Sequence, residues 1–455
     1  MTAPLPTLSR QLTLVDAVMI NAGTMIASAI FIVPASIALG LRAPVLIIAV
    51  WVLGGVVSLL GALCVAELGA AYPDEGGQFV YLRHAYGPLW GFLYGWAATL
   101  VVNPASIAAI AVGFATYLGF FLPLSGTGIR VVAVGSILAL TALNAVGVRP
   151  GVLTQNVLTG LKIGALAAVV GVGLLLPGGS AANFSPAMPA ASVSDLAGPL
   201  GVAMVAVLWA YDGWIEITYV GGEVVDAGRT LPRSIILSTL LVLGLYVLVN
   251  LAYLYLLSPE GMAASPLVAS SAAQAVIGSV GASLVAIAIL VSTLGANNGI
   301  VLTSARIPYA MARDGLFFQW AARVDRRFDT PLLALVAQGV LSAVLALSGT
   351  YQQLITYVVF ASWLFYAMSA AAVIRLRHKA PGLARPYRAW GYPVTPIVFI
   401  GFATWLVGMT IVETPMESAI GAGIVLAGVP AYWYWARRDE GGERRRVMTD
   451  DGDGS

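Results

Sequence analysis

The chain has little charge. Only 10% of its 455 residues are Asp, Glu, Lys or Arg, whereas about a quarter of the residues in a typical soluble domain are charged. Hydrophobic residues make up 59%. This balance excludes an ordinary soluble globular protein and predicts an integral membrane protein. The net charge of +2 is too small to indicate a nucleic-acid partner.

Several reactive or metal-binding patterns are also missing. The single cysteine, Cys64, can form no internal disulfide. The two histidines, His84 and His378, have no partner at metal-ligand spacing, so neither a metal site nor a cofactor is expected. The sequence lacks the phosphate-binding pattern GxxxxGK[ST], which argues against ATP-driven transport. It also lacks a nucleophile constellation, so we do not expect an enzyme.

Long apolar runs dominate what is present. A membrane span needs roughly 20 apolar residues, and the N-terminal "MTAPLPTLSRQLTL" does not have the organisation of a signal peptide. The sequence therefore predicts an all-α membrane protein with twelve transmembrane helices. The predicted spans are residues 13–40, 44–71, 88–121, 129–147, 152–177, 197–221, 232–258, 279–312, 331–348, 351–376, 394–413 and 416–436.

The basic residues predict the orientation. If the N-terminus is cytoplasmic, all but three of the 23 Lys and Arg residues fall on the inner side; the exceptions are Arg42, Arg130 and Lys162, of which Lys162 lies within a span. Lys and Arg favour the cytoplasmic side of membrane proteins, so both termini are predicted to be cytoplasmic. Charged residues at the cytoplasmic span ends could close an inner gate by salt bridges, or could be ordinary solvated loop charges.

Residues 1–436 are predicted to form a single transmembrane domain, because no loop is long enough for a soluble domain. Residues 437–455 are charged and Gly-rich and predict a disordered cytoplasmic tail.

Two spans carry residues that weaken a helix near its middle. The first contains "NAGTMIASAIFIVP" and the sixth contains "VLWAYDGWIEITYVGGEV", with Asp212 and Gly213 in mid-span. They lie about 185 residues apart, which predicts two inverted repeats of five spans with paired broken helices. The repeats cover about 13–177 and 197–376, and two extra helices follow at about 394–436. Small residues also serve as packing surfaces between helices, but a mid-span carboxylate is costly and favours a functional break.

A pair of breaks has a specific chemical capacity. Half-helix N-termini attract anions such as a carboxylate, whereas freed carbonyls attract a cation such as an ammonium. A zwitterion with both groups on one carbon fits between two such breaks.

The motifs of the chain resemble those of the amino acid–polyamine–organocation superfamily, in particular bacterial permeases of the L-amino-acid-transporter type. The resemblance rests on the number and order of several stretches. These are "GTMIASAIFIVP", "ELGAAYPDEGGQFVYLRHAYGPLWGFLYGW", "QNVLTGLKIGALA", "WAYDGW", "GGEVVDAGRTLPRSI", "NNGIVLTSARIPYAMARDGLF" and "ARPYRAWGYPVTP".

The resemblance implies a five-plus-five inverted repeat with substrate held between the breaks of spans 1 and 6. The implied substrate-binding residues are Thr24, Ile26, Ala27, Ser28, Ala29, Ile30, Trp209, Ala210, Tyr211, Asp212 and Gly213. Trp209 stands where the family has an aromatic gate, although a core or interfacial role is an alternative. Asp212 could contact the substrate ammonium or only cap the half-helix.

One departure from the family pattern concerns the first break. The family has Gly-Ser-Gly-Ile-Phe, whereas this chain has Ala27, Ser28 and Ala29 before Ile30 and Phe31. Alanine resists unwinding more than glycine by about 0.8–1 kcal/mol per residue, and its methyl group narrows the site. We therefore expect a more crowded break and a smaller substrate.

Isolated polar residues complete the candidate set. Lys162 is alone in the fifth span, and the resemblance implies that its ammonium replaces the sodium ion of sodium-coupled relatives; a structural tether of span-1 carbonyls is the overlapping alternative. Asn103, Asn297 and Asn298 could line the cavity or form interhelical hydrogen bonds.

These observations predict a sodium-independent secondary transporter of small neutral L-amino acids such as alanine, serine or threonine, in a bacterial inner membrane. Exchange or facilitated uptake is expected, by alternating access. A proton-coupled symporter and a cationic amino acid or polyamine exchanger are alternatives, as are a channel and a non-transporting subunit from other classes. The expected partners are the amino acid and the lipid bilayer, with no nucleic acid and no covalent subunit.

Overall fold

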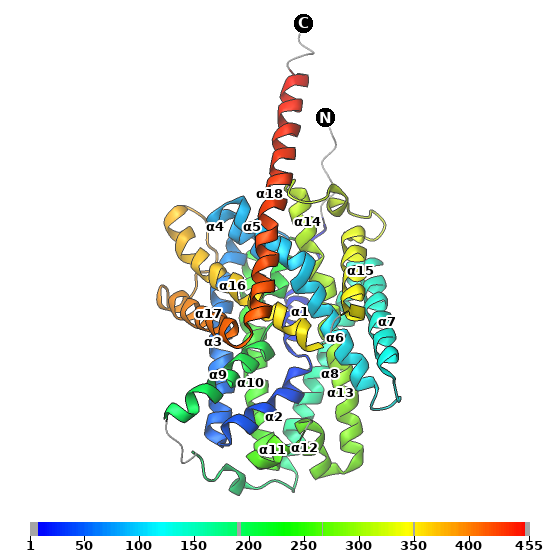
Figure 1. Ribbon diagram of the computed structural model, residues 1–455, viewed down its shortest axis with the longest axis vertical. Coiled ribbons are helices and arrows are strands. Elements are labelled where there is room, and N and C mark those ends of the chain that lie inside the picture. Colours follow the sequence, from blue (N-terminus) through cyan, green and yellow to red (C-terminus); the bar gives the residue numbers. More distant parts are fainter. Residues whose placement is uncertain (1–7, 189–192, 266, 349–350, 451–455) are drawn as a thin grey trace.

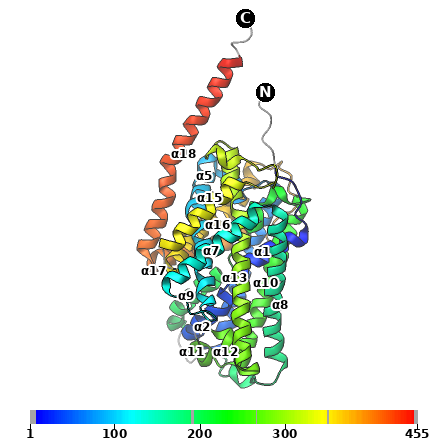
Figure 2. The same ribbon diagram turned by 90° about the vertical axis from the view of Figure 1, so that its right-hand side faces the viewer.

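The computed structural model describes residues 8–188, 193–265, 267–348 and 351–450. Within these ranges the chain is helical apart from its loops, and extended pairing is limited to isolated bridges. Eight helices are long and apolar enough to cross a membrane, and a ninth span is formed if the bent first pair counts as one. The elongated helical bundle is seen in Figures 1 and 2. An all-α multi-pass membrane fold is thereby confirmed.

The first five predicted spans are each represented by one or more helices. The third is interrupted by a π-helical turn at Ala98–Val102, and a short helix, α4 (Gln78–Tyr86), precedes it. The spans comprise α1 (Leu14–Met25) with α2 (Ala29–Leu41), α3 (Pro44–Ala71), α5 (Pro88–Ala97) with α6 (Asn103–Leu118), α7 (Gly126–Ala145) and α8 (Val148–Leu175).

The remaining spans follow the predicted order. They comprise α9 (Val193–Ala210), α10 (Ala227–Leu256), α13 (Ser279–Ser304) with α14 (Arg306–Arg313), α15 (Leu332–Ser348), α16 (Tyr351–Lys379), α17 (Val394–Glu413) and α18 (Pro415–Asp450). Shorter helices connect them: 3-10 turns at Ala181–Phe184, Glu216–Tyr219 (η3), Gly221–Glu223 (η4) and Gln319–Ala322, and α11 (Pro259–Ala264) and α12 (Val268–Ile277).

The first predicted break lies between α1 and α2, which meet at an angle of 41°. A capping box fixes the start of α1, because Thr13 and Asp16 hydrogen-bond each other's backbone N–H groups. The helix ends at Met25, after which Ile26 is extended, and α2 resumes at Ala29. The weak middle of the first span is therefore interrupted despite its alanines.

The sixth span is interrupted more strongly than its predicted range of 197–221 implies. Helix α9 ends at Ala210, and the chain turns through Gly213 before the short 3-10 segment η3. Gly213 has a φ of +113°, and a Cβ there would lie 3.0 Å from the backbone N of Met25. Glycine is required both by this left-handed backbone and by the close approach of the first break.

The two breaks touch through hydrogen bonds rather than through apolar packing alone. Asn21 in α1 donates from Nδ2 to the carbonyl of Trp214 at 2.6 Å and accepts from the N–H of Ile217 at 2.9 Å. Thr24 Oγ1 lies 3.1 Å from the carbonyl of Gly213. One buried asparagine thus satisfies backbone groups that the unwound sixth span leaves without helical partners.

The two chain ends lie at the same end of the bundle in both views (Figures 1 and 2). Helices α11 and α12 lie at the opposite end (Figure 1). A chain that crosses the membrane an even number of times has both of its ends on one side. The chain therefore leaves the bundle on the side from which it entered.

The disordered cytoplasmic tail expected at residues 437–455 stays a prediction. Helix α18 continues from the last span as far as Asp450, and only residues 451–455 lie outside the described residues. Extending an existing helix adds a hydrogen bond per residue without a new nucleation step. For this reason a polar sequence that would not begin a helix can still prolong one.

Ion pairs connect the helix ends on the side of the two termini. Arg306 and Glu223 form a bidentate pair, with Nε–Oε1 at 2.7 Å and Nη2–Oε2 at 3.1 Å, and both side chains are inaccessible to solvent. Arg377 binds Glu67 in the same bidentate manner. The predicted inner-gate charges are therefore partly organised into specific pairs.

We expect the Glu223→Gln variant to lose about 3–5 kcal/mol of unfolding free energy, because it leaves the buried guanidinium of Arg306 without its counter-charge. A matched control is Asp314→Asn, which removes the pair with Arg83, where both side chains are about 30% exposed; it should cost only about 0–1 kcal/mol. Denaturant unfolding in detergent measures both. Equal losses in the two variants would contradict the expectation.

Candidate substrate-binding site

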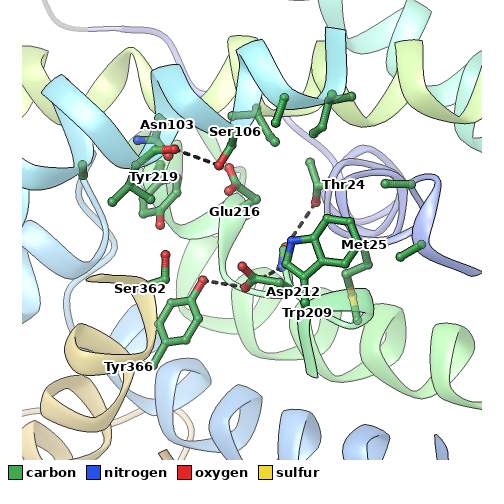
Figure 3. Close-up of a pocket in the computed structure, with 18 of the residues that line it drawn as sticks. Thr24, Met25, Asn103, Ser106, Trp209, Asp212, Glu216, Tyr219, Ser362 and Tyr366 are labelled. Carbon is green, nitrogen blue, oxygen red and sulfur yellow. Dashed lines mark hydrogen bonds between the residues drawn. The ribbon is translucent and has the colours of Figure 1, made fainter. Parts of the chain in front are cut away.

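A cavity of about 90 Å³ lies between the two breaks. Figure 3 shows that the polar residues around it belong to several different helices and turns. The residues that line it are Thr24, Met25, Ala27, Ser28, Ala29, Gln78, Tyr94, Ala98, Val102, Asn103, Ser106, Ala109, Ile110, Trp209, Ala210, Asp212, Gly213, Glu216, Tyr219, Ile300, Ser362, Phe365 and Tyr366. Spans 1, 3 and 6 therefore meet α16 around one buried space.

The first break contributes backbone to the cavity. Ala27, Ser28 and Ala29 line it, and α2 begins at Ala29 without a side-chain cap. The first N–H groups of a helix have no intrahelical acceptor, and the helix dipole adds partial positive charge there. This edge of the cavity is suited to an anionic group such as a carboxylate.

The sixth-span break contributes a carboxylate. Asp212 Oδ1 accepts hydrogen bonds from the hydroxyl of Tyr366 at 2.7 Å and from the N–H of Gly213 at 3.0 Å, as Figure 3 shows. No hydrogen bond from the described residues reaches Oδ2, and the C-terminal end of α9 lies beside it. This edge of the cavity is suited to a cation such as an ammonium.

Lys162 of α8 lies behind the first break and not in the cavity lining. Its Nζ lies 2.5 Å from the carbonyl of Gly23 and 2.8 Å from that of Ile26, with 1% of the residue exposed. Ser292 of α13 donates to the same Ile26 carbonyl at 3.0 Å. An ammonium group thus satisfies the carbonyls that the end of α1 leaves free.

Three of the residues expected in the substrate site are directed elsewhere. Ile26 presents its carbonyl to Lys162, and its side chain is buried in the core, as is that of Ile30. The Tyr211 hydroxyl donates to the carbonyl of Trp51 at 3.1 Å. Because successive residues of a turn point in different directions, a contiguous motif places only some side chains on the cavity. Thr24, Ala27, Ser28, Ala29, Trp209, Ala210, Asp212 and Gly213 do line it.

Of the three asparagines expected near the cavity, one lines it and two do not. Asn103 lines the cavity, and its Nδ2 has no hydrogen-bond partner among the described residues. Asn297 donates to the carbonyl of Ile107 at 3.3 Å. Asn298 binds Gln155 Oε1 at 2.9 Å and accepts from Asn144 at 2.9 Å. The last two join helices to one another and do not line the cavity.

Sequence reasoning missed several polar lining residues, among them Ser106, Tyr219, Ser362 and Tyr366. Each is one ordinary polar residue within an apolar span, and no local pattern separates it from the others. Glu216 did carry a signal, since it follows Asp212 by four residues in the same span. Its place in the lining shows that the cavity holds two carboxyl groups.

Two interrupted helices around a buried polar cavity, within a multi-pass membrane bundle, define a membrane transporter of small molecules. The sequence comparisons specify the class further: a model of the amino acid permease family matches residues 12–433. The chain therefore belongs to the amino acid permease family and is a membrane transporter of amino acids, not an enzyme.

Individual relatives cover almost the whole chain. The serine/threonine exchanger SteT of Bacillus subtilis (strain 168) is 32% identical over 434 residues, which are 95% of this chain and 98% of the relative. The human Asc-type amino acid transporter 1 is 33% identical, over 94% of this chain and 83% of the relative. The human b(0,+)-type amino acid transporter 1 is 32% identical, over 94% and 88%.

Proposed function

We propose that the chain is a sodium-independent exchanger or facilitated transporter of small neutral L-amino acids. The observation that carries this proposal is the small cavity between an uncapped helix N-terminus at Ala29 and the carboxylate of Asp212. The amino acid carboxylate would bind the N–H groups of the first break. Its ammonium would bind Asp212 and the end of α9. The relative SteT is named as a serine/threonine exchanger, which agrees with this substrate class.

The size of the cavity supports small substrates. The cavity of about 90 Å³ is small, which favours alanine, serine and threonine over leucine and phenylalanine. Ala27, Ala29 and Trp209 all line this space.

Sodium independence is supported by Lys162. The free carbonyls at a helix end are the groups that would coordinate sodium in a broken-helix transporter. Here the carbonyls of Gly23 and Ile26 already accept hydrogen bonds from an ammonium. A fixed positive charge at this position also repels a second cation.

The expected mechanism is alternating access in a bacterial inner membrane, with both termini cytoplasmic. The repeats would move against each other around the central site. Access from the terminal side would require the ion pairs there, such as Arg306–Glu223 and Arg377–Glu67, to separate or move. The distribution of basic residues supports the orientation.

Uptake into proteoliposomes tests the proposal. Purified protein should exchange external labelled alanine for internal alanine at the same rate with and without sodium and proton gradients. Competition by each amino acid in turn should give serine and threonine as strong competitors and phenylalanine as a weak one. A requirement for sodium, or leucine or phenylalanine outcompeting alanine, would overturn the proposal. Non-saturable flux without counterflow would instead indicate a channel.

A cationic amino acid or polyamine exchanger is a second candidate, favoured by the two carboxyl groups, Asp212 and Glu216, in the cavity lining. The volume argues against long cationic side chains. The same competition series decides this, because arginine, lysine or putrescine should compete strongly only under the second candidate.

We expect the double variant Ala27→Gly and Ala29→Gly to accept larger amino acids. Both residues line the cavity, and glycine removes their methyl groups while weakening the start of α2 by about 1 kcal/mol per residue. Leucine should then compete with alanine uptake about as well as serine does. Ala38→Gly, at a buried position away from the cavity, is the control. An unchanged competition profile in the double variant would contradict the size argument.

A further inference from the structure

The second carboxyl group of the cavity, Glu216, has no place in the recognition of an amino acid's main-chain groups. An α-amino acid offers one ammonium and one carboxylate, and Asp212 with the N-terminal end of α2 already matches both. Glu216 belongs to η3, one helical turn beyond Asp212, and is 8% exposed. It is directed toward the part of the cavity lined by Ser106 and Tyr219 (Figure 3).

The carboxyl group of Glu216 is held in place from one side only. Thr303 of α13, itself fully buried, donates from Oγ1 to Glu216 Oε2 at 2.5 Å. No hydrogen bond reaches Oε1 from the described residues, although Glu216 lines the cavity. Because Glu216 lines the cavity, Oε1 is open to a hydrogen bond from a substrate.

No basic side chain among the described residues supplies that donor. The cavity lining contains Asp212 and Glu216 but no Lys, Arg or His. Two buried cations have partners elsewhere: Lys162 binds the carbonyls of the first break, and Arg306 binds Glu223. Tyr94 and Tyr219 hydrogen-bond each other at 2.8 Å, and Tyr366 donates to Asp212.

The residues near Glu216 offer further hydrogen-bonding groups to a polar substrate side chain. Ser106 donates to the carbonyl of Val102 at 2.8 Å, which leaves its oxygen free to accept. Asn103 Nδ2 has no partner in the part of the chain that the structure describes, and Ser362 also lines the cavity. When the main-chain groups of the substrate occupy the two breaks, its side chain points into this polar region.

We propose that Glu216 is a specificity-determining residue that selects amino acids whose side chain carries a hydrogen-bond donor on the β-carbon. This rests on the proposed function. The donor is a hydroxyl, as in serine and threonine, or a short ammonium, as in L-2,3-diaminopropionate, which has nearly the shape of serine. Thr303 is the positioning residue that fixes the carboxyl group. Alanine has no side-chain donor for Oε1.

Isosteric competitors test the proposal in the wild-type protein. Proteoliposomes loaded with L-alanine take up labelled L-alanine in the presence of threonine, valine, serine or L-2,3-diaminopropionate. Threonine should compete at a concentration roughly ten-fold or more below that of valine, because a hydrogen bond to an acidic group distinguishes two side chains of equal shape. Valine competing as well as threonine would overturn the proposal while leaving alanine transport intact. Failure to exchange any amino acid would instead overturn the proposed function.

Two substitutions of Glu216 and one control variant separate the roles of its hydrogen-bond acceptor and of its charge. Glu216→Leu should bring threonine and valine to within about two-fold of each other. Glu216→Gln retains a carbonyl acceptor, so it should keep most of the preference for threonine but lose recognition of L-2,3-diaminopropionate if the ammonium binds a charged carboxylate. Glu260→Gln, at an exposed position of helix α11, is the matched control and should behave as wild type. A threonine preference that persists in Glu216→Leu would overturn the proposal, and the wild-type comparison decides it if that variant does not fold.

Discussion

The Lys162→Ala variant is expected to exchange amino acids roughly 100-fold more slowly than the wild type. The ammonium makes two charge-assisted hydrogen bonds, to the carbonyls of Gly23 and Ile26, and each such bond contributes about 1.5–3 kcal/mol. Without them the buried carbonyl of Gly23 loses its ammonium partner, and that of Ile26 keeps only the bond from Ser292. The first break then loses the geometry that aims its N–H groups at the substrate.

Initial rates of alanine exchange in proteoliposomes measure this effect, with the amount of folded protein determined in parallel. Lys162→Gln retains neutral donors on a side chain that is one bond shorter and should keep an intermediate rate. Ser292→Ala removes a neutral donor to the same Ile26 carbonyl and is the control for loss of a single bond, with a much smaller effect. Wild-type rates in Lys162→Ala would contradict the role given to this lysine. A sodium-stimulated rate in the variant would support the idea that the ammonium stands in a cation's place.

The Asp212→Asn variant is expected to weaken alanine binding by about 10–100-fold. The substitution keeps the shape of the side chain but removes the charge that would pair with the substrate ammonium, a loss of about 1.5–3 kcal/mol. The cap on Gly213 can persist, because the asparagine oxygen still accepts a hydrogen bond. The variant therefore separates ammonium binding from helix capping, the two roles that the sequence leaves open.

The half-saturation concentration for alanine uptake measures this effect. Tyr366→Phe is the matched control, since it removes the hydroxyl that lies 2.7 Å from Asp212 Oδ1 but leaves the carboxylate in place. Its effect should be smaller than that of Asp212→Asn. An unchanged half-saturation concentration in Asp212→Asn would assign Asp212 to capping alone.

The helical architecture could be predicted because it depends on local composition. A segment of about 20 apolar residues has few alternatives to a helix in a membrane, where every backbone group must find an internal partner. The chain order of the spans follows directly.

The positions of the two breaks were also visible in the sequence. Small residues around Ala27 and the pair Asp212–Gly213 mark points at which helix propensity and burial cost favour an interruption. The sequence could not show which neighbours of these residues face the cavity. Ile26, Ile30 and Tyr211 lie within or beside the same motifs, yet their side chains pack into the core.

The sequence by itself determined that this is a multi-pass helical membrane protein with two interrupted spans and one lysine that could not remain unpaired. These properties follow from composition and from the cost of burying polar groups along a single segment. Only the tertiary structure decided which side chains share the cavity. Ser106, Glu216, Ser362 and Tyr366 come from three different spans, and their proximity depends on how the helices pack. The same packing brings Asn21 to Trp214 and Lys162 to Gly23. Contacts between residues far apart in the chain leave no periodicity in the sequence, so the sequence alone could not show them.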